Sequence, residues 1–164
     1  GSLICIPYIA SLNLPNLVIA TPDVGGSKRA ALFSKRLKAP LVLCNKTRAR
    51  ANEVESIQII GDVKGKDVVL IDDMVDTAGT ITRAADEMMK AGANSVRAVA
   101  SHCVMSEPAS ERVMNSALEE IVFTDSIPFT KDCKKVKQLS VADMFARAID
   151  RVLRDESVSE EFDF

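Results

Sequence analysis

The feature that most constrains this chain is an apolar strand pattern that runs directly into a group of carboxylates. Residues Val68 to Ile71 are continuously apolar and mostly β-branched, which predicts a strand buried on both faces and parallel to its neighbours. Apolar residues at helical spacing follow from Ile81 to Met88, and Gly92 stands where a helix would end. The segment between them, residues 72–80, is therefore expected to be a loop that opens onto a helix N-terminus.

This loop has the composition of a sugar-phosphate site. Free backbone N–H groups and the positive end of the helix dipole favour a phosphate at a helix N-terminus. Three carboxylates would repel that phosphate, unless sugar hydroxyls donate to them and Mg²⁺ offsets the remaining charge. We therefore predict a site for ribose 5-phosphate. Its expected residues are Asp72, Asp73, Asp76, Thr77, Ala78, Gly79 and Thr80.

The rest of the chain alternates strand and helix patterns, which predicts an α/β fold with a mostly parallel sheet flanked by helices. The expected strands lie at 17–20, 41–44, 57–60, 68–71, 96–101 and 121–124, and the expected helices at 27–37, after 80, after 108 and at 141–153. The strands at 57–60 and 68–71 flank a short polar turn, so we expect them to form a local hairpin that projects from the sheet.

A second loop also follows a strand and precedes a helix. It contains Asp23, Val24, Gly25 and Gly26. The paired glycines allow positive φ, so successive N–H groups could converge on an anion. Ligands in open α/β sheets bind at the carboxyl ends of the strands, so two such loops at that edge indicate one shared site.

Residues 72–80 resemble the phosphoribosyl pyrophosphate (PRPP) loop shared by type I phosphoribosyltransferases and PRPP synthetases. Several other segments look like the PRPP synthetase (ribose-phosphate pyrophosphokinase) family in particular, in the family's order. These segments are 21–26, 46–52, 60–67, 100–106 and 156–162. The resemblance implies a type I phosphoribosyltransferase-like (Rossmann-like) single domain.

The resemblance also implies site roles. Lys46 and Arg48 would be catalytic, and Arg48 would also contact ribose 5-phosphate. The segment Asp23 to Gly26 would be the pyrophosphate loop, with Asp23 helping to hold Mg²⁺. Family enzymes transfer the diphosphoryl group of Mg·ATP to ribose 5-phosphate and release PRPP and AMP. ATP and ribose 5-phosphate are thus the implied substrates, and Mg²⁺ the implied cofactor.

The length of 164 residues corresponds to one domain, whereas the family has two homologous domains. The match covers the C-terminal domain only. Residues 1–2 resemble a cloning scar, and residues 3–164 are the expected domain. We therefore expect an isolated domain that lacks full activity. Its apolar stretch 3–17 is a candidate for an exposed former interdomain surface.

Two other functions fit the same residues. A phosphoribosyltransferase would consume PRPP instead of making it, although no nucleobase hood is recognisable. A non-catalytic regulatory subunit associated with PRPP synthetases would keep the fold, although such members tend to change the catalytic loop. Lys46, Arg48 and the acidic residues are all retained here.

Composition excludes some partners. The net charge of −2 gives no electrostatic footprint for nucleic acid or an anionic membrane, and no apolar run has transmembrane length. The four cysteines lack metal-ligand spacing, so we expect buried free thiols and a cytoplasmic protein.

By resemblance we expect a homo-oligomer, a hexamer in intact family members and a dimer for this chain. His102, the single histidine, is expected to be hydrogen-bonded, partly buried and not catalytic.

Overall fold

The computed structural model describes residues 1–47 and 56–159, and for residues 46 and 47 only the backbone. Its strands and helices alternate along most of the chain. The strands are β1 (Leu17–Thr21), β2 (Leu41–Thr47), β3 (Ser56–Ile60), β4 (Asp67–Val75), β5 (Ser95–Cys103), β6 (Ile121–Thr124) and β7 (Val136–Leu139). The helices are α1 (Ser2–Ser11), α2 (Ser27–Leu37), α3 (Gly79–Lys90), α4 (Ala109–Asn115) and α5 (Ala142–Leu153), and a 3₁₀ turn, η1, spans Val24–Gly26.

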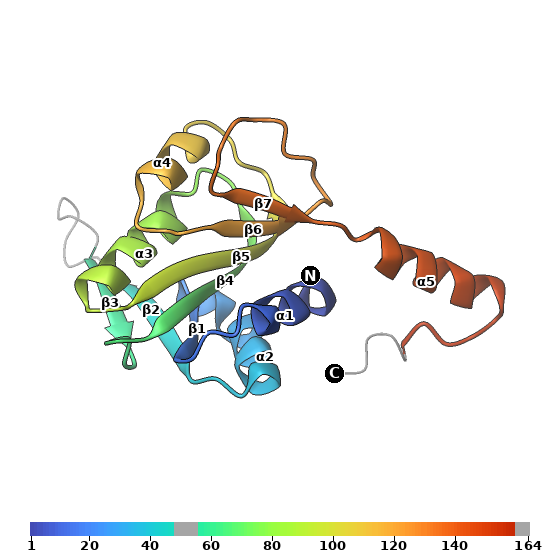
Figure 1. The fold of residues 1–164 in the computed structure, drawn as a ribbon, viewed down its shortest axis with the longest axis horizontal. Helices are drawn as coiled ribbons and strands as arrows, with labels where there is room; N and C mark the ends of the chain where they lie inside the picture. The colour runs from blue at the N-terminus through green and yellow to red at the C-terminus, as the bar shows by residue number, and fades with distance from the viewer. Residues whose placement is uncertain (48–55, 160–164) are drawn as a thin grey trace.

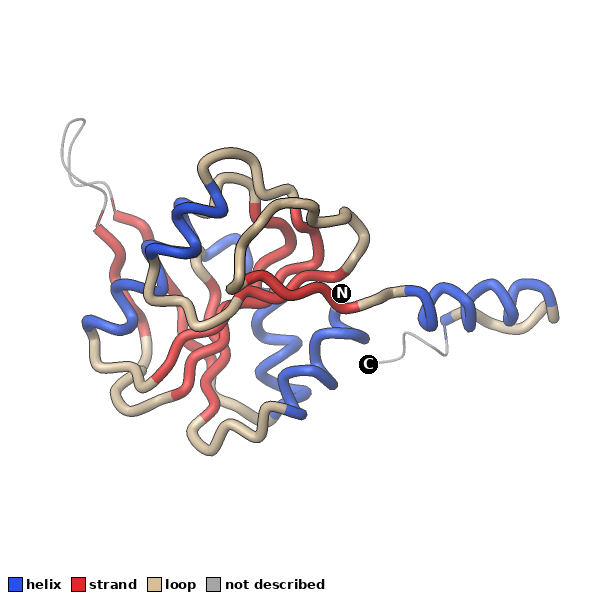
Figure 2. Tube along the Cα trace, turned by 45° about the horizontal axis from the view of Figure 1, so that its top comes forward, coloured by secondary structure: helices blue, strands red, loops and turns tan. Residues whose placement is uncertain are grey.

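The strands form one sheet in the order β3-β2-β1-β4-β5-β6-β7, flanked on both faces by helices (Figure 1). All neighbouring pairs are parallel except β2 and β3, which are antiparallel. Helices α1 and α2 cover one face and α3 and α4 cover the other (Figure 2). This arrangement confirms the predicted α/β fold with a mostly parallel sheet.

The burial of β4 explains its central position. Its first five residues, Asp67 to Ile71, are all buried, as expected for a strand covered by helices on both sides. By contrast, β3 alternates between exposed and half-buried residues, which suits the edge of the sheet. The predicted hairpin between 57–60 and 68–71 was therefore wrong, because β3 pairs with β2, opposite Leu43 to Thr47, and not with β4.

The N-terminal stretch is a packed helix, which the apolar pattern alone did not indicate. Cys5 and Ile9 of α1 are each 1% exposed and pack with α2 and the sheet in one hydrophobic cluster. Tyr8 donates from its hydroxyl to Glu120 at 2.8 Å. Residues 3–17 are thus not the exposed surface that we expected. A helix whose sequence is apolar on all sides can still bury only one of them, here the side of Cys5 and Ile9.

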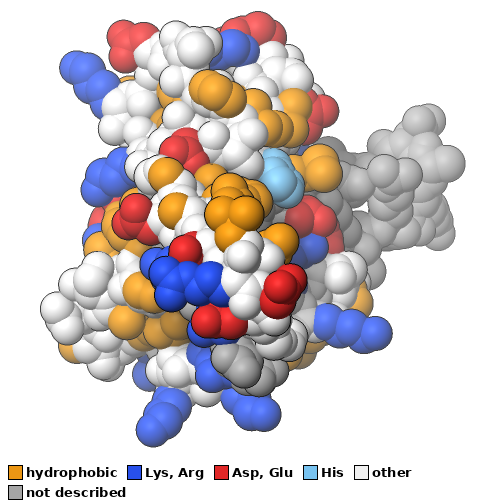
Figure 3. Space-filling view, turned by 90° about the vertical axis from the view of Figure 1, so that its right-hand side faces the viewer, with side chains coloured by type: hydrophobic (Ala, Val, Ile, Leu, Met, Phe, Trp, Pro, Cys, Tyr) orange, Lys and Arg blue, Asp and Glu red, His pale blue; other side chains and the backbone are white. Residues whose placement is uncertain are grey.

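The exposed apolar surface lies instead on α5, which projects from the body of the molecule (Figure 1). None of its residues is buried. Phe145, Ile149, Val152 and Leu153 are 55–78% exposed, and their spacing places them on one side of the helix. Seen from the side of the molecule on which α5 projects, the surface shows hydrophobic side chains interleaved with charged ones (Figure 3).

Two expectations about single residue types have different outcomes. All four cysteines are free and buried, as predicted. His102 is hydrogen-bonded, with 2.9 Å between its Nδ1 and Ser126 Oγ, but it is exposed and not partly buried. It is the second-last residue of β5, and its side chain faces away from the neighbouring buried Cys103.

Candidate functional site

The candidate site lies where the connections of β1 and β4 diverge. These two strands are neighbours, and the chain leaves β1 towards β2 but leaves β4 towards β5. In an open parallel sheet, such a switch point leaves a crevice at the carboxyl ends of the strands. A cavity of about 160 Å³ lies there, lined by Asp23 after β1 and by Asp72 and residues 74–81, which run from the end of β4 into α3. The two predicted loops are therefore brought together.

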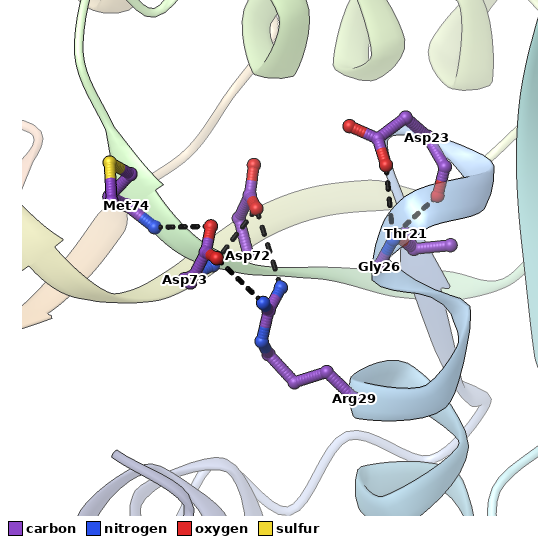
Figure 4. Close-up of polar contacts among 7 residues, drawn as sticks. All are labelled: Thr21, Asp23, Gly26, Arg29, Asp72, Asp73 and Met74. Carbon is purple, nitrogen blue, oxygen red and sulfur yellow. Dashed lines mark hydrogen bonds and ion pairs between the residues drawn. The ribbon is translucent and has the colours of Figure 1, made fainter.

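The loop after β1 is organised by local hydrogen bonds (Figure 4). Asp23 Oδ1 accepts from the Gly26 N–H at 3.0 Å, and the Thr21 hydroxyl donates to the Asp23 carbonyl at 2.8 Å. Asp23 thereby caps the η1 turn that leads into α2. The short capping Asp holds its own carboxylate at the edge of the cavity.

The reason for the paired glycines differs from the one we expected. Neither Gly25 nor Gly26 has a positive φ; that of Gly26 is −78°. A Cβ on Gly26 would instead lie 2.3 Å from Thr21 Oγ1, and one on Gly25 would lie 3.1 Å from Asp23 Oδ1. The prediction of left-handed glycines was wrong. Gly26 is required because the loop folds tightly back on Thr21 at the end of β1, whereas a Cβ on Gly25 would meet only the Asp23 side chain.

An acidic pair at the end of β4 is joined to α2 by an arginine (Figure 4). The Arg29 guanidinium lies 2.8 Å from Asp73 Oδ2 and 3.5 Å from Asp72 Oδ1. The backbone N–H of Asp73 also donates to Asp72 Oδ1 at 2.9 Å. The two predicted ribose-binding carboxylates are therefore already paired with a cation from α2.

The two carboxylates differ in acidity. Burial raises the pKa of Asp72 to about 6, and the negative charges of Asp73 and Asp23 add to the rise. Burial also acts to raise the pKa of Asp73, but hydrogen bonding, including that of the Met74 N–H, and the Arg29 charge lower it on balance. Asp72 is thus the carboxyl of the pair that gains most from a ligand hydroxyl or a cation.

The loop after β4 is held from its outer side. Arg112 on α4 donates from Nη1 to the Thr77 carbonyl at 2.9 Å, and Thr82 donates from its hydroxyl to the Ala78 carbonyl at 2.8 Å. Arg83 donates from Nε to the Gly79 carbonyl at 3.0 Å. Ala78 has the left-handed φ of +58°, which costs a residue with a Cβ about 1 kcal/mol. Surrounding contacts must stabilise that conformation.

The predicted site residues have different outcomes. Those that line the common cavity are Asp23, Asp72, Asp76, Thr77, Ala78, Gly79 and Thr80. Asp73 does not line the cavity; its carboxylate is paired with Arg29. Arg48 lies outside the described residues. Lys46 is placed only through its backbone, opposite Ile57 at the end of β2.

Arg29 and Arg112 contact the site residues but were not predicted from the sequence. Arg29 is 44 residues from Asp73, and Arg112 is 35 residues from Thr77. No local spacing signals contacts of this length. The available hint was that Arg29 lies one turn after the glycines, on a helix that starts beside the predicted site.

The cavity fits Mg²⁺ that arrives with a phosphorylated ligand. Within residues 1–47 and 56–159, no three His, Cys, Asp or Glu side chains lie close enough together to hold a metal by themselves. Mg²⁺ commonly binds one or two carboxylates and takes its other ligands from water and substrate phosphates. Asp23 and Asp72, from two different loops, line one cavity and supply that number of carboxylates.

Comparison with known protein families gives one match over most of the chain. The model of the phosphoribosyl synthetase-associated domain matches residues 44–163. The ribose-phosphate pyrophosphokinase of Porphyromonas gingivalis is 58% identical over 160 residues, which are 97% of this chain and 51% of that protein. The ribose-phosphate pyrophosphokinase of Helicobacter hepaticus is 49% identical over 162 residues, 99% of this chain and 52% of that protein. The chain spans about half the length of these relatives.

Solved structures agree on the fold. The phosphoribosylpyrophosphate synthetase of Mycobacterium smegmatis superposes with a TM-score of 0.83 at 32% identity, over 92% of this chain and 50% of that one. A purine phosphoribosyltransferase of Pyrococcus horikoshii gives a TM-score of 0.50 at 19% identity, over 82% of this chain and 80% of that one. The second likeness concerns the fold alone.

Within the described ranges, no helix has both the length and the apolar content to cross a membrane.

Proposed function

Because the chain belongs to the phosphoribosyl synthetase-associated domain family, we propose that it serves as the C-terminal domain of a ribose-phosphate pyrophosphokinase. The intact enzyme would transfer diphosphate from Mg·ATP to ribose 5-phosphate and release PRPP and AMP. The relatives that carry this name are about twice as long as this chain. This domain would supply the ribose 5-phosphate site, and the part not contained in this sequence would complete the ATP site.

The observation that carries the proposal is the single cavity lined by both strand-end loops. The 5-phosphate would lie at the N-terminus of α3, against residues 76–80, where backbone N–H groups favour an anion. The ribose hydroxyls would donate to Asp72 and Asp73. Asp23 and the η1 turn would face the diphosphate and its Mg²⁺, which would neutralise the charge of the transferred group.

Lys46 and Arg48 are proposed as the catalytic residues from the family resemblance. Their cations would stabilise the charge that develops on the transferred phosphoryl group. Lys46 lies on β2, two strands from β4 in the sheet order β2-β1-β4. We expect Lys46→Ala, introduced into a full-length enzyme, to lower kcat much more than it raises the KM for ribose 5-phosphate. Unchanged turnover would contradict this assignment.

Calorimetric titration of this chain tests the proposed site without requiring turnover. We expect saturable binding of ribose 5-phosphate that strengthens with Mg²⁺, and much weaker binding of ribose, which lacks the phosphate. Asp76→Ala should abolish the binding, whereas Asp86→Ala, farther along α3 and outside the lining of the cavity, should leave it intact. Absence of ribose 5-phosphate binding by the folded chain would contradict a pre-formed site in this domain.

The same titration with PRPP and free nucleobases separates the proposal from a phosphoribosyltransferase. Release of pyrophosphate on incubation with PRPP and a purine or pyrimidine base would favour the transferase and overturn the assignment. The similar transferase structure shares only the fold, at 19% identity. The regulatory-subunit alternative predicts that a full-length protein with this domain forms no AMP.

We also propose that the chain self-associates through α5 and that it is cytoplasmic. The apolar stripe of α5, defined by Phe145, Ile149, Val152 and Leu153, supports the first proposal, since an exposed stripe of this kind favours association. The four buried free thiols support the second, because disulfides are rare in the cytosol. Sedimentation analysis should show a dimer that Phe145→Ser with Ile149→Ser converts to a monomer.

A further inference from the structure

Arg112 is the side chain outside the two loops that reaches the proposed phosphate-binding segment from another helix. It lies on α4 and donates from Nη1 to the Thr77 carbonyl at 2.9 Å. The same atom is close to Gly79: a Cβ built there would lie 3.4 Å from it. Arg112 is exposed and does not line the strand-end cavity; it lines a separate cavity that shares Thr77 and Gly79 with it.

The orientation of one peptide group follows from this contact. The Thr77–Ala78 peptide is trans, so its C=O and N–H point in opposite directions within one plane. Because the Thr77 carbonyl points to Arg112, the Ala78 N–H points away from Arg112. Ala78 and its neighbours line the strand-end cavity. Arg112 thus determines where this N–H donor is directed.

The next peptide is oriented in the same way by α3 itself. The Ala78 carbonyl accepts from the Thr82 hydroxyl at 2.8 Å and from the Thr82 N–H at 3.1 Å. The Gly79 N–H must therefore point away from the helix, towards its N-terminal side. Two consecutive N–H groups then face the cavity, which is the arrangement that binds an anion.

The left-handed backbone of Ala78 makes outside support necessary. A residue with a Cβ prefers to leave this conformation, and leaving it would rotate the peptide that Arg112 holds. Thr82 is 6% exposed and belongs to the same helix, so it cannot hold the peptide on the other side of Ala78. The contact from α4 performs that task.

We propose that Arg112 is a positioning residue that pre-organises the N–H groups of Ala78 and Gly79 to bind the phosphate of a sugar phosphate. The inference rests on the proposed function, because it concerns the same site. Arg112 does not contact the ligand. It acts through the Thr77 carbonyl and links α4 to the phosphate loop.

Titration of the chain with ribose 5-phosphate, combined with amide chemical shifts, tests this role. In the unaltered chain, the ligand should shift the amide resonances of Ala78 and Gly79. Arg112→Met should weaken binding about tenfold, the effect of losing one hydrogen bond from a charged donor. It should also remove most of the ligand-induced shift of Ala78. Arg112→Lys, which keeps the charge and a donor, should bind better than Arg112→Met.

Lys134→Met is the matched control, since it also replaces an exposed cation by methionine but lies on the segment before β7. It should bind ribose 5-phosphate like the unaltered chain. If the unaltered chain binds the sugar phosphate and Arg112→Met binds equally well, the positioning role is wrong while the proposed function stands. If the unaltered chain does not bind, both are overturned. Equal losses in Arg112→Met and Lys134→Met would show a general charge effect and contradict the proposal.

Discussion

The two loops of the candidate site occupy equivalent positions but are stabilised differently. Both follow a buried parallel strand and precede a helix. The loop after β1 is closed by its own residues, since Asp23 caps Gly26 and Thr21 bonds to Asp23. The loop after β4 depends on side chains outside it, including Arg112, 35 residues beyond Thr77 in the chain. One loop is therefore shaped by local sequence, and the other by the packing of two helices.

This difference teaches that a phosphate-type loop can be pre-organised in two ways. Close backbone packing requires glycine, as at Gly26, where a Cβ would meet Thr21. Hydrogen bonds from side chains outside the loop instead allow an alanine to adopt the left-handed conformation, as at Ala78. Substitutions in the first loop should therefore affect folding most, whereas substitutions around the second should affect binding most.

The largest effect is expected in the loop after β1. Gly26→Ala places a Cβ 2.3 Å from Thr21 Oγ1, so the strand end or the η1 turn must move. Overpacking of this kind should lower the free energy of unfolding by about 2 kcal/mol, measured by urea denaturation. Gly25→Ala is the control in the same loop, because its new Cβ meets only the end of the Asp23 side chain. An equal loss of stability in both variants would contradict the packing argument.

The next effect concerns the pH dependence of stability. Because the pKa of Asp72 in the folded chain is about 6, above its usual value near 4, the folded state binds the proton more tightly than the unfolded state. Stability from this group is therefore present at low pH and is lost as the pH rises through about 6. Asp72→Asn should remove this loss.

At pH 7, Asp72→Asn should raise the free energy of unfolding by about 1.5 kcal/mol. This is roughly half of the free energy that corresponds to the raised pKa, because the side chain keeps some solvent contact. At pH 4 it should change little. Urea unfolding at both pH values measures the difference. The same variant should bind ribose 5-phosphate more weakly. A variant that is less stable than the unaltered chain at pH 7 would show that the Arg29 contact outweighs burial.

A smaller effect is expected from the α3 side of the second loop. Thr82→Val keeps the volume but removes the hydroxyl that donates to the Ala78 carbonyl. Loss of one buried hydrogen bond should reduce stability by about 1 kcal/mol and weaken ribose 5-phosphate binding a few-fold. Thermal unfolding and calorimetry measure both quantities. Thr80→Val would be uninformative as a control because it lines the cavity, so Thr130→Val, on the segment before β7, serves instead.

The smallest effect on stability is expected at the strained residue itself. Ala78→Gly removes the cost of the left-handed conformation, but it also gives the unfolded chain more freedom, and the two changes are each about 1 kcal/mol. The free energy of unfolding should therefore change by no more than about 0.5 kcal/mol. Binding should nevertheless weaken, because the loop loses rigidity. A variant with unchanged affinity and a clearly changed stability would contradict the prediction that Ala78 matters more for binding than for folding.

Much of the fold could be predicted because its signals are local. The continuous apolar run at 68–71 identified a buried central strand. The loop predicted at 72–80 is shorter, because β4 continues to Val75 and α3 begins at Gly79. The predicted bounds of α2 (Ser27–Leu37) and β6 (Ile121–Thr124) agree with the structure. Strand pairing was not predictable in the same way. The polar turn at 61–66 looks like a hairpin connection, yet it carries the chain from the edge of the sheet to its centre.

The site was predictable to a similar extent. The residues of both loops could be chosen because their types and order carry the chemistry of phosphate, diol and Mg²⁺. Arg29 and Arg112 could not, because their partners lie 44 and 35 residues away and only the packed helices bring them together. The glycine positions were identified correctly but for the wrong reason, since close packing and not positive φ requires them.

A crystal structure of this chain with ribose 5-phosphate and Mg²⁺ would locate the phosphate. We expect it within hydrogen-bonding distance of the Ala78 and Gly79 N–H groups, with the ribose beside Asp72. A rival location exists on the outer side of the same loop, where a cavity of about 510 Å³ is lined by Arg83 and Arg112 among others. A phosphate bound there, on the two arginines, would contradict both the proposed site and the role of Arg112 in positioning it.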